Sequence, residues 1–377
     1  MTAAIFWLSG LLMIYTLVGY PLLINWVARF HARRDCELPP TTAELPRVCV
    51  IIAAYNEAQT LERKLDSLSS QNYPTDRLSI LVVSDGSTDG TVALLERNAW
   101  RARSLVTVER RGKPHALNLA AANANAEILL FTDARQPLGP DAVSTLVRAL
   151  GLPEVGVAGG ALSQRASATN EAENVGLYWR YEAWIRKSEA RVHSTAGASG
   201  ALYAIRAGDF TPLPEDTLLD DFETPIRILR KGKRIVLCEG AQAFDEVHHG
   251  VARERERKIR TLAGNYQAFA RNPWLFNPLA NPIWVQFISH KVLRLLIPYF
   301  FVMALVSAWL LDGWVYDLAW IGMLAFLVMA ALGFVSQRLR NHRALGFCYA
   351  FAALNLASVA GLARYLAGSA DVRWKRA

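Results

Sequence analysis

The sequence is poor in cysteine, and its cysteines are not grouped. Its 377 residues include four, Cys36, Cys49, Cys238 and Cys348, with no CxxC spacing. This excludes a small disulfide-stabilised scaffold and the common zinc and redox motifs. Because each cysteine stands alone, we expect all four to be reduced and structural.

Two familiar nucleotide-binding motifs are also missing. No GxGxxG follows the first expected strand and no GxxxxGK[ST] occurs, which excludes a dinucleotide fingerprint and a P-loop. The net charge of +8 comes without a nucleic-acid-binding motif. We therefore expect no nucleic-acid partner, and we attribute the positive charge to anionic membrane lipids or a phosphorylated ligand.

Charged residues are scarce in four stretches that approach or exceed the length of a membrane helix. These stretches are residues 3–28, 295–311, 318–335 and 345–366. A bilayer core takes about 20 helical residues. They predict an N-terminal transmembrane anchor and about three C-terminal transmembrane segments. Aromatic and basic residues from Ile283 to Lys291 predict a helix lying in the membrane interface before the first of these segments.

The chain therefore divides into three parts: an anchor over 1–29, a soluble domain over 47–275, and the membrane region over 276–377. Arg29, Arg33 and Arg34 directly follow the first apolar stretch, and basic residues beside a span tend to stay in the cytoplasm. We expect a multi-pass protein of the plasma membrane, the inner membrane in a bacterium, with a cytoplasmic catalytic domain.

Two aspartates stand at the ends of expected strands in the soluble domain. Apolar β-branched runs alternate there with helical patterns, which predicts an α/β fold with a mostly parallel sheet. One run ends at Asp85, and another ends just before Asp133. Ligands bind at the carboxyl ends of such strands, so both are candidate ligand-binding residues. Taken singly, each could instead be a turn or capping residue.

A basic loop and an acidic pair add further candidates. Lys113 begins an expected helix, where a cation and the helix N-terminus suit a phosphate. Asp220 and Asp221 begin another helix, where they could deprotonate a hydroxyl group or simply stabilise the helix dipole. Trp179 and Trp184 share a third helix, where aromatic residues either pack or stack on acceptor sugars.

Seven short motifs occur in an order and spacing that together resemble one family. They are Ala54-Tyr55-Asn56-Glu57, Asp85-Gly86-Ser87, Gly112-Lys113 through Asn118, Thr132-Asp133-Ala134, Gly197 to Arg206, Leu219-Asp220-Asp221-Phe222 and Arg257-Lys258-Ile259-Arg260-Thr261. Over about residues 47–267 the chain resembles the inverting glycosyltransferases of family 2, membrane-bound relatives of hyaluronan, cellulose and chitin-type synthases. The resemblance implies a GT-A fold, a single Rossmann-like domain.

The resemblance also implies roles for individual residues. Asp221 would be the catalytic base with Asp220 beside it, and Asp133 would hold a Mg²⁺ or Mn²⁺ ion. The expected donor-binding residues are Ala54, Tyr55, Glu57, Asp85, Lys113, Asp133, Arg135, Arg257 and Arg260. Gly200 and Thr261, together with the two tryptophans, are expected to bind the acceptor.

Two positions depart from the family pattern. Arg135 stands where the family commonly has a second aspartate, and an arginine cannot ligate a cation. Thr261 stands where processive members place a tryptophan that stacks on the acceptor sugar. We therefore expect the addition of one or a few sugars rather than a long polymer.

Together these features predict a membrane-anchored inverting glycosyltransferase. Its donor would be a nucleoside-diphosphate sugar, a UDP-sugar in our expectation, and its acceptor a hydroxyl of a membrane-associated glycolipid or polysaccharide. Two alternatives stay open: a polyprenyl-phosphate glycosyltransferase, and an inactive nucleotide-sugar-binding scaffold in a polysaccharide synthase complex. An oligomer is compatible with each of these functions.

Overall fold

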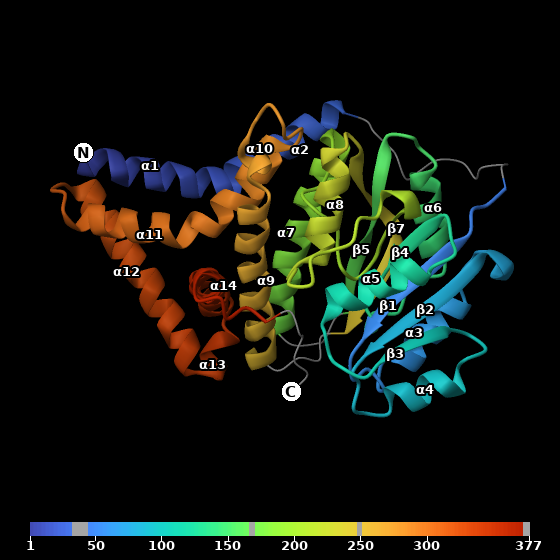
Figure 1. Ribbon diagram of the computed structural model, residues 1–377. Helices are drawn as coiled ribbons and strands as arrows, with labels where there is room; N and C mark the ends of the chain where they lie inside the picture. The colour runs from blue at the N-terminus through green and yellow to red at the C-terminus, as the bar shows by residue number, and fades with distance from the viewer. Residues whose placement is uncertain (32–43, 166–169, 247–250, 372–377) are drawn as a thin grey trace. The chain divides into compact units, whose positions relative to one another are not determined.

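The computed structural model describes residues 1–31, 44–165, 170–246 and 251–371, which fall into two compact units (Figure 1). An α/β unit is formed mainly by His31–Arg165 and Glu189–Glu246. A helical unit is formed by Met1–Phe30, Ala166–Ser188 and Val247–Ser369.

The α/β unit is built on a mixed sheet whose seven described strands run in the order β3-β2-β1-β4-β6-β5-β7. Their bounds are β1 (Val48–Ala54), β2 (Leu78–Asp85), β3 (Arg103–Thr107), β4 (Ile128–Phe131), β5 (Val155–Arg165), β6 (Tyr203–Arg206) and β7 (Arg234–Glu246). Strands β1 to β4 are parallel, whereas β6 is antiparallel to its neighbours β4 and β5. Since β2 and β4 flank β1 on either side, Asp85 and Asp133 emerge at the same edge of the sheet.

Helices pack on this sheet between the strands. They are α3 (Leu61–Ser69), α4 (Thr91–Arg97), α5 (Lys113–Asn123), α6 (Ala142–Leu150) and α8 (Asp220–Arg230), with short 3-10 turns η2 (Thr75–Arg77) and η3 (Ala207–Asp209). Alternate residues of β1, such as Val50 and Ile52, join one core with Leu61 and Leu65 of α3. α5 packs against β1 and β2. The predicted α/β class is confirmed.

The helical unit consists of long helices joined by short turns. Its elements are α1 (Thr2–Ile14), η1 (Tyr15–Gly19), α2 (Tyr20–Phe30), most of α7 (Asn170–Val192), α9 (Val251–Arg271), η4 (Pro273–Phe276), α10 (Trp284–Gln286), η5 (Phe287–Val292), α11 (Leu293–Trp309), α12 (Trp314–Val335), α13 (Gln337–Arg340) and α14 (Arg343–Leu366). Among the described residues, four continuous helices are long and apolar enough to cross a membrane: Thr2–Phe30, Trp284–Trp309, Trp314–Val335 and Arg343–Leu366.

The segment expected to lie in the membrane interface is not a separate helix. Residues 284–292 continue through the π-helical turn η5 into α11, so that Trp284–Trp309 forms one helix. Two contacts place this segment among the other helices of its unit. His290 is buried and lies 3.1 Å from Glu182 Oε1 on α7, and Ser289 Oγ lies 2.8 Å from the hydroxyl oxygen of Tyr15.

The prediction that all the cysteines are reduced is wrong, because Cys238 is bonded. Cys238, fully buried in β7, is disulfide-bonded, whereas Cys49 and Cys348 are free thiols in buried positions. Spacing along the chain cannot indicate such a bond, because a disulfide requires only that two sulfur atoms meet in the folded structure.

Candidate active site

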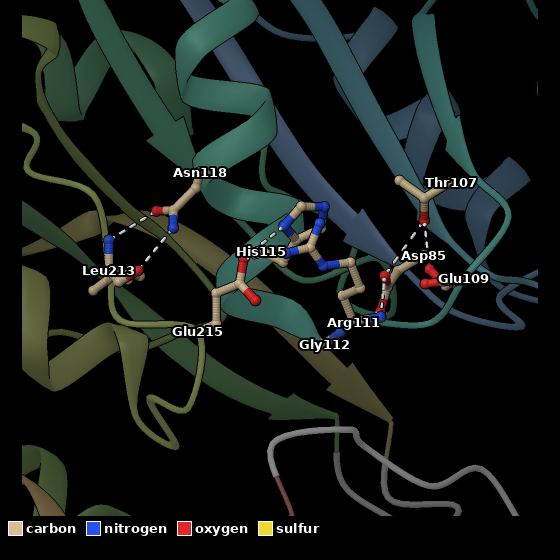
Figure 2. A network of polar contacts seen from close by, with 9 residues as sticks. All are labelled: Asp85, Thr107, Glu109, Arg111, Gly112, His115, Asn118, Leu213 and Glu215. Carbon is tan, nitrogen blue, oxygen red and sulfur yellow. Dashed lines mark hydrogen bonds and ion pairs between the residues drawn. The ribbon is translucent and has the colours of Figure 1, made fainter.

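Asp85, the last residue of β2, is completely buried, and its carboxylate binds backbone N–H groups (Figure 2). Its Oδ1 accepts from the Arg111 N–H at 2.9 Å and its Oδ2 from the Gly112 N–H at 2.7 Å. These charge-assisted hydrogen bonds compensate for the burial of the charge. Asp85 thus fastens the basic loop before α5 to the end of β2, which is a structural role beside the expected donor contact.

The same loop brings Arg110 onto Tyr55, which follows β1. The Arg110 guanidinium lies 3.7 Å from the centroid of the Tyr55 ring, a cation–π contact. Its Nε and Nη2 are buried without a hydrogen-bond partner among the described residues. Gly86 permits this close approach, because it has φ +64° and an added Cβ would lie 2.9 Å from the Arg110 nitrogen. The sequence analysis did not single out Arg110.

Lys113, the first residue of α5, lies among four of the other expected site residues. Its Nζ lies 3.0 Å from Asp133 Oδ1 and 3.2 Å from Asp220 Oδ1. The Gly200 N–H donates to Asp221 Oδ2 at 2.9 Å. A Cβ on Gly200 would lie 3.2 Å from that oxygen and 3.6 Å from Lys113 Nζ. Five residues from the ends of β4, α5 and α8 and from the loop before β6 therefore meet at one place.

The charges in this cluster shift one another's pKa values. Burial disfavours the charged form of Lys113, but the carboxylates of Asp133, Asp220 and Asp221 outweigh it and raise its pKa. Burial alone would raise the pKa of Asp133, and the Lys113 ammonium reverses this and holds that pKa below its usual value. Burial and then the neighbouring Asp220 charge raise the pKa of Asp221 to about 6. Asp221 is thus a stronger base than Asp133.

Behind the acidic pair lie polar atoms with no partner. Asp220 Oδ2, the Tyr203 hydroxyl and Thr224 Oγ1 are each buried without a hydrogen bond in the described part of the chain. Burial, then the charges of Asp220 and Asp221, raises the pKa of Tyr203 well above its usual value. Tyr203 also stacks on Phe131, with ring centroids 4.9 Å apart. Its position inside an apolar strand gave no signal of a role near the site.

Arg135 contacts two acceptors within the α/β unit. Its Nε lies 3.3 Å from Asp245 Oδ1 on β7. In the amide orientation that satisfies both groups, the Gln136 side-chain oxygen accepts from Arg135 Nη2 at 2.8 Å. This arginine therefore already has acceptors within the fold, and its expected contact with phosphate stays a prediction.

The donor set fits a hard divalent cation in one specific way. The described residues contain no group of three His, Cys, Asp or Glu side chains that could enclose a metal ion. Mg²⁺ and similar ions, however, are commonly held by one or two carboxylates together with substrate phosphates and water. Asp133, with about a third of its side chain exposed and one oxygen on Lys113, can supply such a carboxylate.

The segment leading to Asp220 is clamped onto α5 (Figure 2). Asn118 donates to the Leu213 carbonyl and accepts from the Leu213 N–H, both at 2.8 Å. Glu215 contacts Arg111 at 2.6 Å and His115 at 3.3 Å. These contacts hold the segment that leads into Asp220 and Asp221 against α5. The sequence analysis quoted Asn118 as part of a motif but assigned it no role.

The remaining candidates stand at the end of β1, in the loop after it, and on α9. Ala54 is the buried last residue of β1, and the Glu57 N–H donates to Thr91 Oγ1 at 2.8 Å. Arg257, Arg260 and Thr261 belong to α9 of the helical unit.

The two tryptophans lie on α7 in the helical unit. Trp184 donates through Nε1 to Asn25 Oδ1 at 3.1 Å, which supports its packing role. The side chain of Trp179 is outside the described part of the structure. The expected role of each tryptophan in acceptor binding stays a prediction.

Comparison with known proteins identifies the family. The model for glycosyl transferase family 2 matches residues 49–208. An N-acetylglucosaminyltransferase of Bradyrhizobium elkanii is 34% identical over 132 residues, which are 34% of this chain and 71% of the relative. The chain belongs to glycosyltransferase family 2. The expected family and GT-A fold are thereby confirmed, whereas a specific relationship to hyaluronan, cellulose or chitin-type synthases stays a prediction.

Two further similarities extend over more of the chain. A β-monoglucosyldiacylglycerol synthase of Synechocystis sp. is 27% identical over 289 residues, 70% of this chain and 58% of the relative, so the chain spans little more than half of that protein. A solved mannosyltransferase of Pyrobaculum calidifontis, in complex with GDP-Man and Mn²⁺, is 25% identical with a TM-score of 0.73, over 97% of this chain and 99% of its own.

The Asp85 anchor can be tested by Asp85→Asn. An asparagine presents an NH₂ group to one of the two N–H donors, so we expect a loss of about 1–3 kcal/mol in the free energy of unfolding. Weaker nucleotide binding should accompany it. Urea unfolding in detergent and calorimetric titration with nucleotide would measure these effects. Asp66→Asn is the control, because Asp66 forms an exposed ion pair with Arg101. Equal stability of the two variants would contradict the anchor.

Proposed function

We propose that this family 2 protein is a membrane-anchored inverting glycosyltransferase that moves a sugar from a nucleoside diphosphate to a hydroxyl group of a membrane lipid. The observation that carries the proposal is the convergence of Asp133, Asp220, Asp221 and Gly200 on Lys113. Lys113 and Asp133 would bind the diphosphate, and Asp221 beside them would act on the acceptor hydroxyl. An inactive scaffold would not require all of these groups.

The donor half of the site is Lys113 with Asp133. The Lys113 ammonium faces the place where charge develops as the diphosphate leaves. A Mg²⁺ or Mn²⁺ ion held by Asp133 would supply further neutralisation of that charge. The Pyrobaculum relative, solved with Mn²⁺ and GDP-Man, supports this assignment. UDP-sugars are our expected donors, and GDP-sugars are the second class to assay.

The acceptor half is Asp221. Its pKa of about 6 leaves it ionised at neutral pH, yet more basic than an ordinary aspartate. The Gly200 N–H orients one carboxylate oxygen, and the other can accept the proton of the attacking hydroxyl. Asp220 acts on Asp221 through its charge while binding Lys113.

Two observations support a glycolipid product. Four helices in the described part of the chain are long and apolar enough to cross a membrane, and the Synechocystis relative is named for a glucosyl-diacylglycerol product. We propose diacylglycerol-type lipids as the first acceptors to test. Incubating membranes that contain the protein with a panel of nucleotide sugars and diacylglycerol vesicles should yield a new glycolipid. Donor binding without any turnover would favour the scaffold alternative.

Asp221→Asn should fold and bind donor but lose transfer by ~100-fold or more, because the amide cannot accept the hydroxyl proton. Product formation and calorimetric nucleotide binding would measure the two effects. Asp216→Asn, in the exposed part of the loop before α8, is the matched control and should retain transfer. Near-normal turnover in Asp221→Asn would point instead to a phosphate acceptor, which needs no base.

The rate should also depend on pH. Because Asp221 must be ionised to act as a base and its pKa is about 6, kcat/KM should be level above that pH and fall below it by about tenfold per unit. Initial rates between pH 4.5 and 8 would show this, with donor affinity measured in parallel. A rate that is unchanged down to pH 4.5 would exclude Asp221 as the base.

Topology is a separate test. Arg29 lies in the last turn of the first helix, shortly before the chain enters the α/β unit, which favours a cytoplasmic unit. The bonded Cys238, however, counts against a reducing compartment. If all four helices cross, a phosphatase reporter after Ala377 should be active outside the cytoplasm. A phosphatase reporter after His31 should lie in the cytoplasm and be inactive. An inactive reporter after Ala377 would mean that one of the four helices does not cross.

A further inference from the structure

A lysine lies in the interior of the α/β unit, on a helix face that is otherwise apolar. Lys64 of α3 is fully buried beside Leu61, Leu65 and Leu68. Burying an ammonium group is costly unless hydrogen bonds and an opposite charge compensate for it. A leucine or methionine would be the expected residue here, so the lysine indicates a specific task.

Both contacts of the Lys64 ammonium are with the loop that follows β4. Nζ donates to Thr132 Oγ1 at 2.7 Å and to the Gln136 carbonyl oxygen at 2.6 Å. These two residues stand immediately on either side of Asp133-Ala134-Arg135. One side chain therefore joins both ends of the loop that presents the proposed cation ligand.

The hydrogen-bond directions require a donor at this position. Thr132 Oγ1 gives its single proton to the Ala201 carbonyl at 2.6 Å, so it can only accept from Lys64. The Gln136 carbonyl likewise only accepts. Ala201 follows Gly200, whose N–H binds Asp221. The contacts of Lys64 thus extend from α3 through Thr132 to the loop that orients the proposed base.

The clamp does not depend on the charge of Lys64. Burial lowers the pKa of Lys64 to about 7, opposed by the negative charge of Asp133. A neutral amine keeps two N–H groups, which are enough for its two acceptors. The contacts should therefore persist on both sides of neutral pH.

We infer that Lys64 is a positioning residue of the donor site, holding the Asp133 loop in place by bridging Thr132 and Gln136. The inference rests on the proposed function for its link to the donor, whereas the clamp itself does not. Lys64 touches neither reacting group. Its effect on transfer should therefore fall on donor binding rather than on proton transfer by Asp221.

Lys64→Met keeps the length and removes the donors. In the 377-residue protein in detergent, we expect amide hydrogen exchange of peptides covering 132–136 and 200–202 to accelerate at least tenfold. Affinity for UDP with Mn²⁺, or GDP with Mn²⁺, should weaken at least tenfold, and the donor KM should rise more than kcat falls. Leu65→Val, at the adjacent buried position, is the control and should leave exchange in both peptides and nucleotide affinity unchanged.

Thr132→Val is the second variant, used where Lys64→Met does not fold. It removes one acceptor and should accelerate amide hydrogen exchange in the same two peptides.

Unchanged exchange in either folded variant would overturn the clamp. Faster exchange with unaltered nucleotide affinity would overturn the positioning role. A wild-type protein that binds neither nucleotide would refute the proposed function and the positioning role, while the exchange result would still decide the clamp.

Discussion

The site depends on one ammonium group, that of Lys113. Three carboxylates approach one another at the end of the sheet, and without a cation between them their repulsion would oppose the approach of the loop after β4 to the start of α8. The contacts of Lys113 with Asp133 and Asp220 join these elements at 3.0 Å and 3.2 Å. The loop from Leu213 to Glu215 and the Asp85 anchor hold α5 in the orientation that makes this possible.

The fold and the principal acidic residues could be predicted because they are encoded locally. A buried strand and the aspartate that ends it lie within one short stretch, as at Asp85, and parallel strands deliver such residues to a common edge. The acidic pair at the start of α8 could be found in the same way. The position of a residue in an expected helix, however, does not reveal which distant residues its side chain contacts. That Lys113 lies between Asp133 and Asp220 depends on contacts between residues 20 and 107 positions apart.

The residues that were missed have their partners at long range or carry no distinctive pattern. Lys64 shares a helix face with three leucines, which was a signal, but only the fold shows that its side chain reaches Thr132 and Gln136. Arg110 stood in the basic loop, and its stacking on Tyr55 joins segments 55 positions apart. For the same reason the spacing of the cysteines could not indicate that Cys238 forms a disulfide.

The balance of charge bears on how the proposed donor site would hold a nucleoside diphosphate. Above about pH 6, where Asp221 is ionised, one ammonium group faces three carboxylates, and the cluster is negative. A diphosphate brings further negative charge to Lys113, which would then have to serve two sets of acceptors. A divalent cation held by Asp133 would neutralise part of the carboxylate charge and leave Lys113 available to the diphosphate. Arg135 already forms an ion pair with Asp245, so its charge is not available to replace that cation. The departure from the family's second aspartate therefore leaves cation binding more dependent on the diphosphate itself, so donor and cation should bind as a pair.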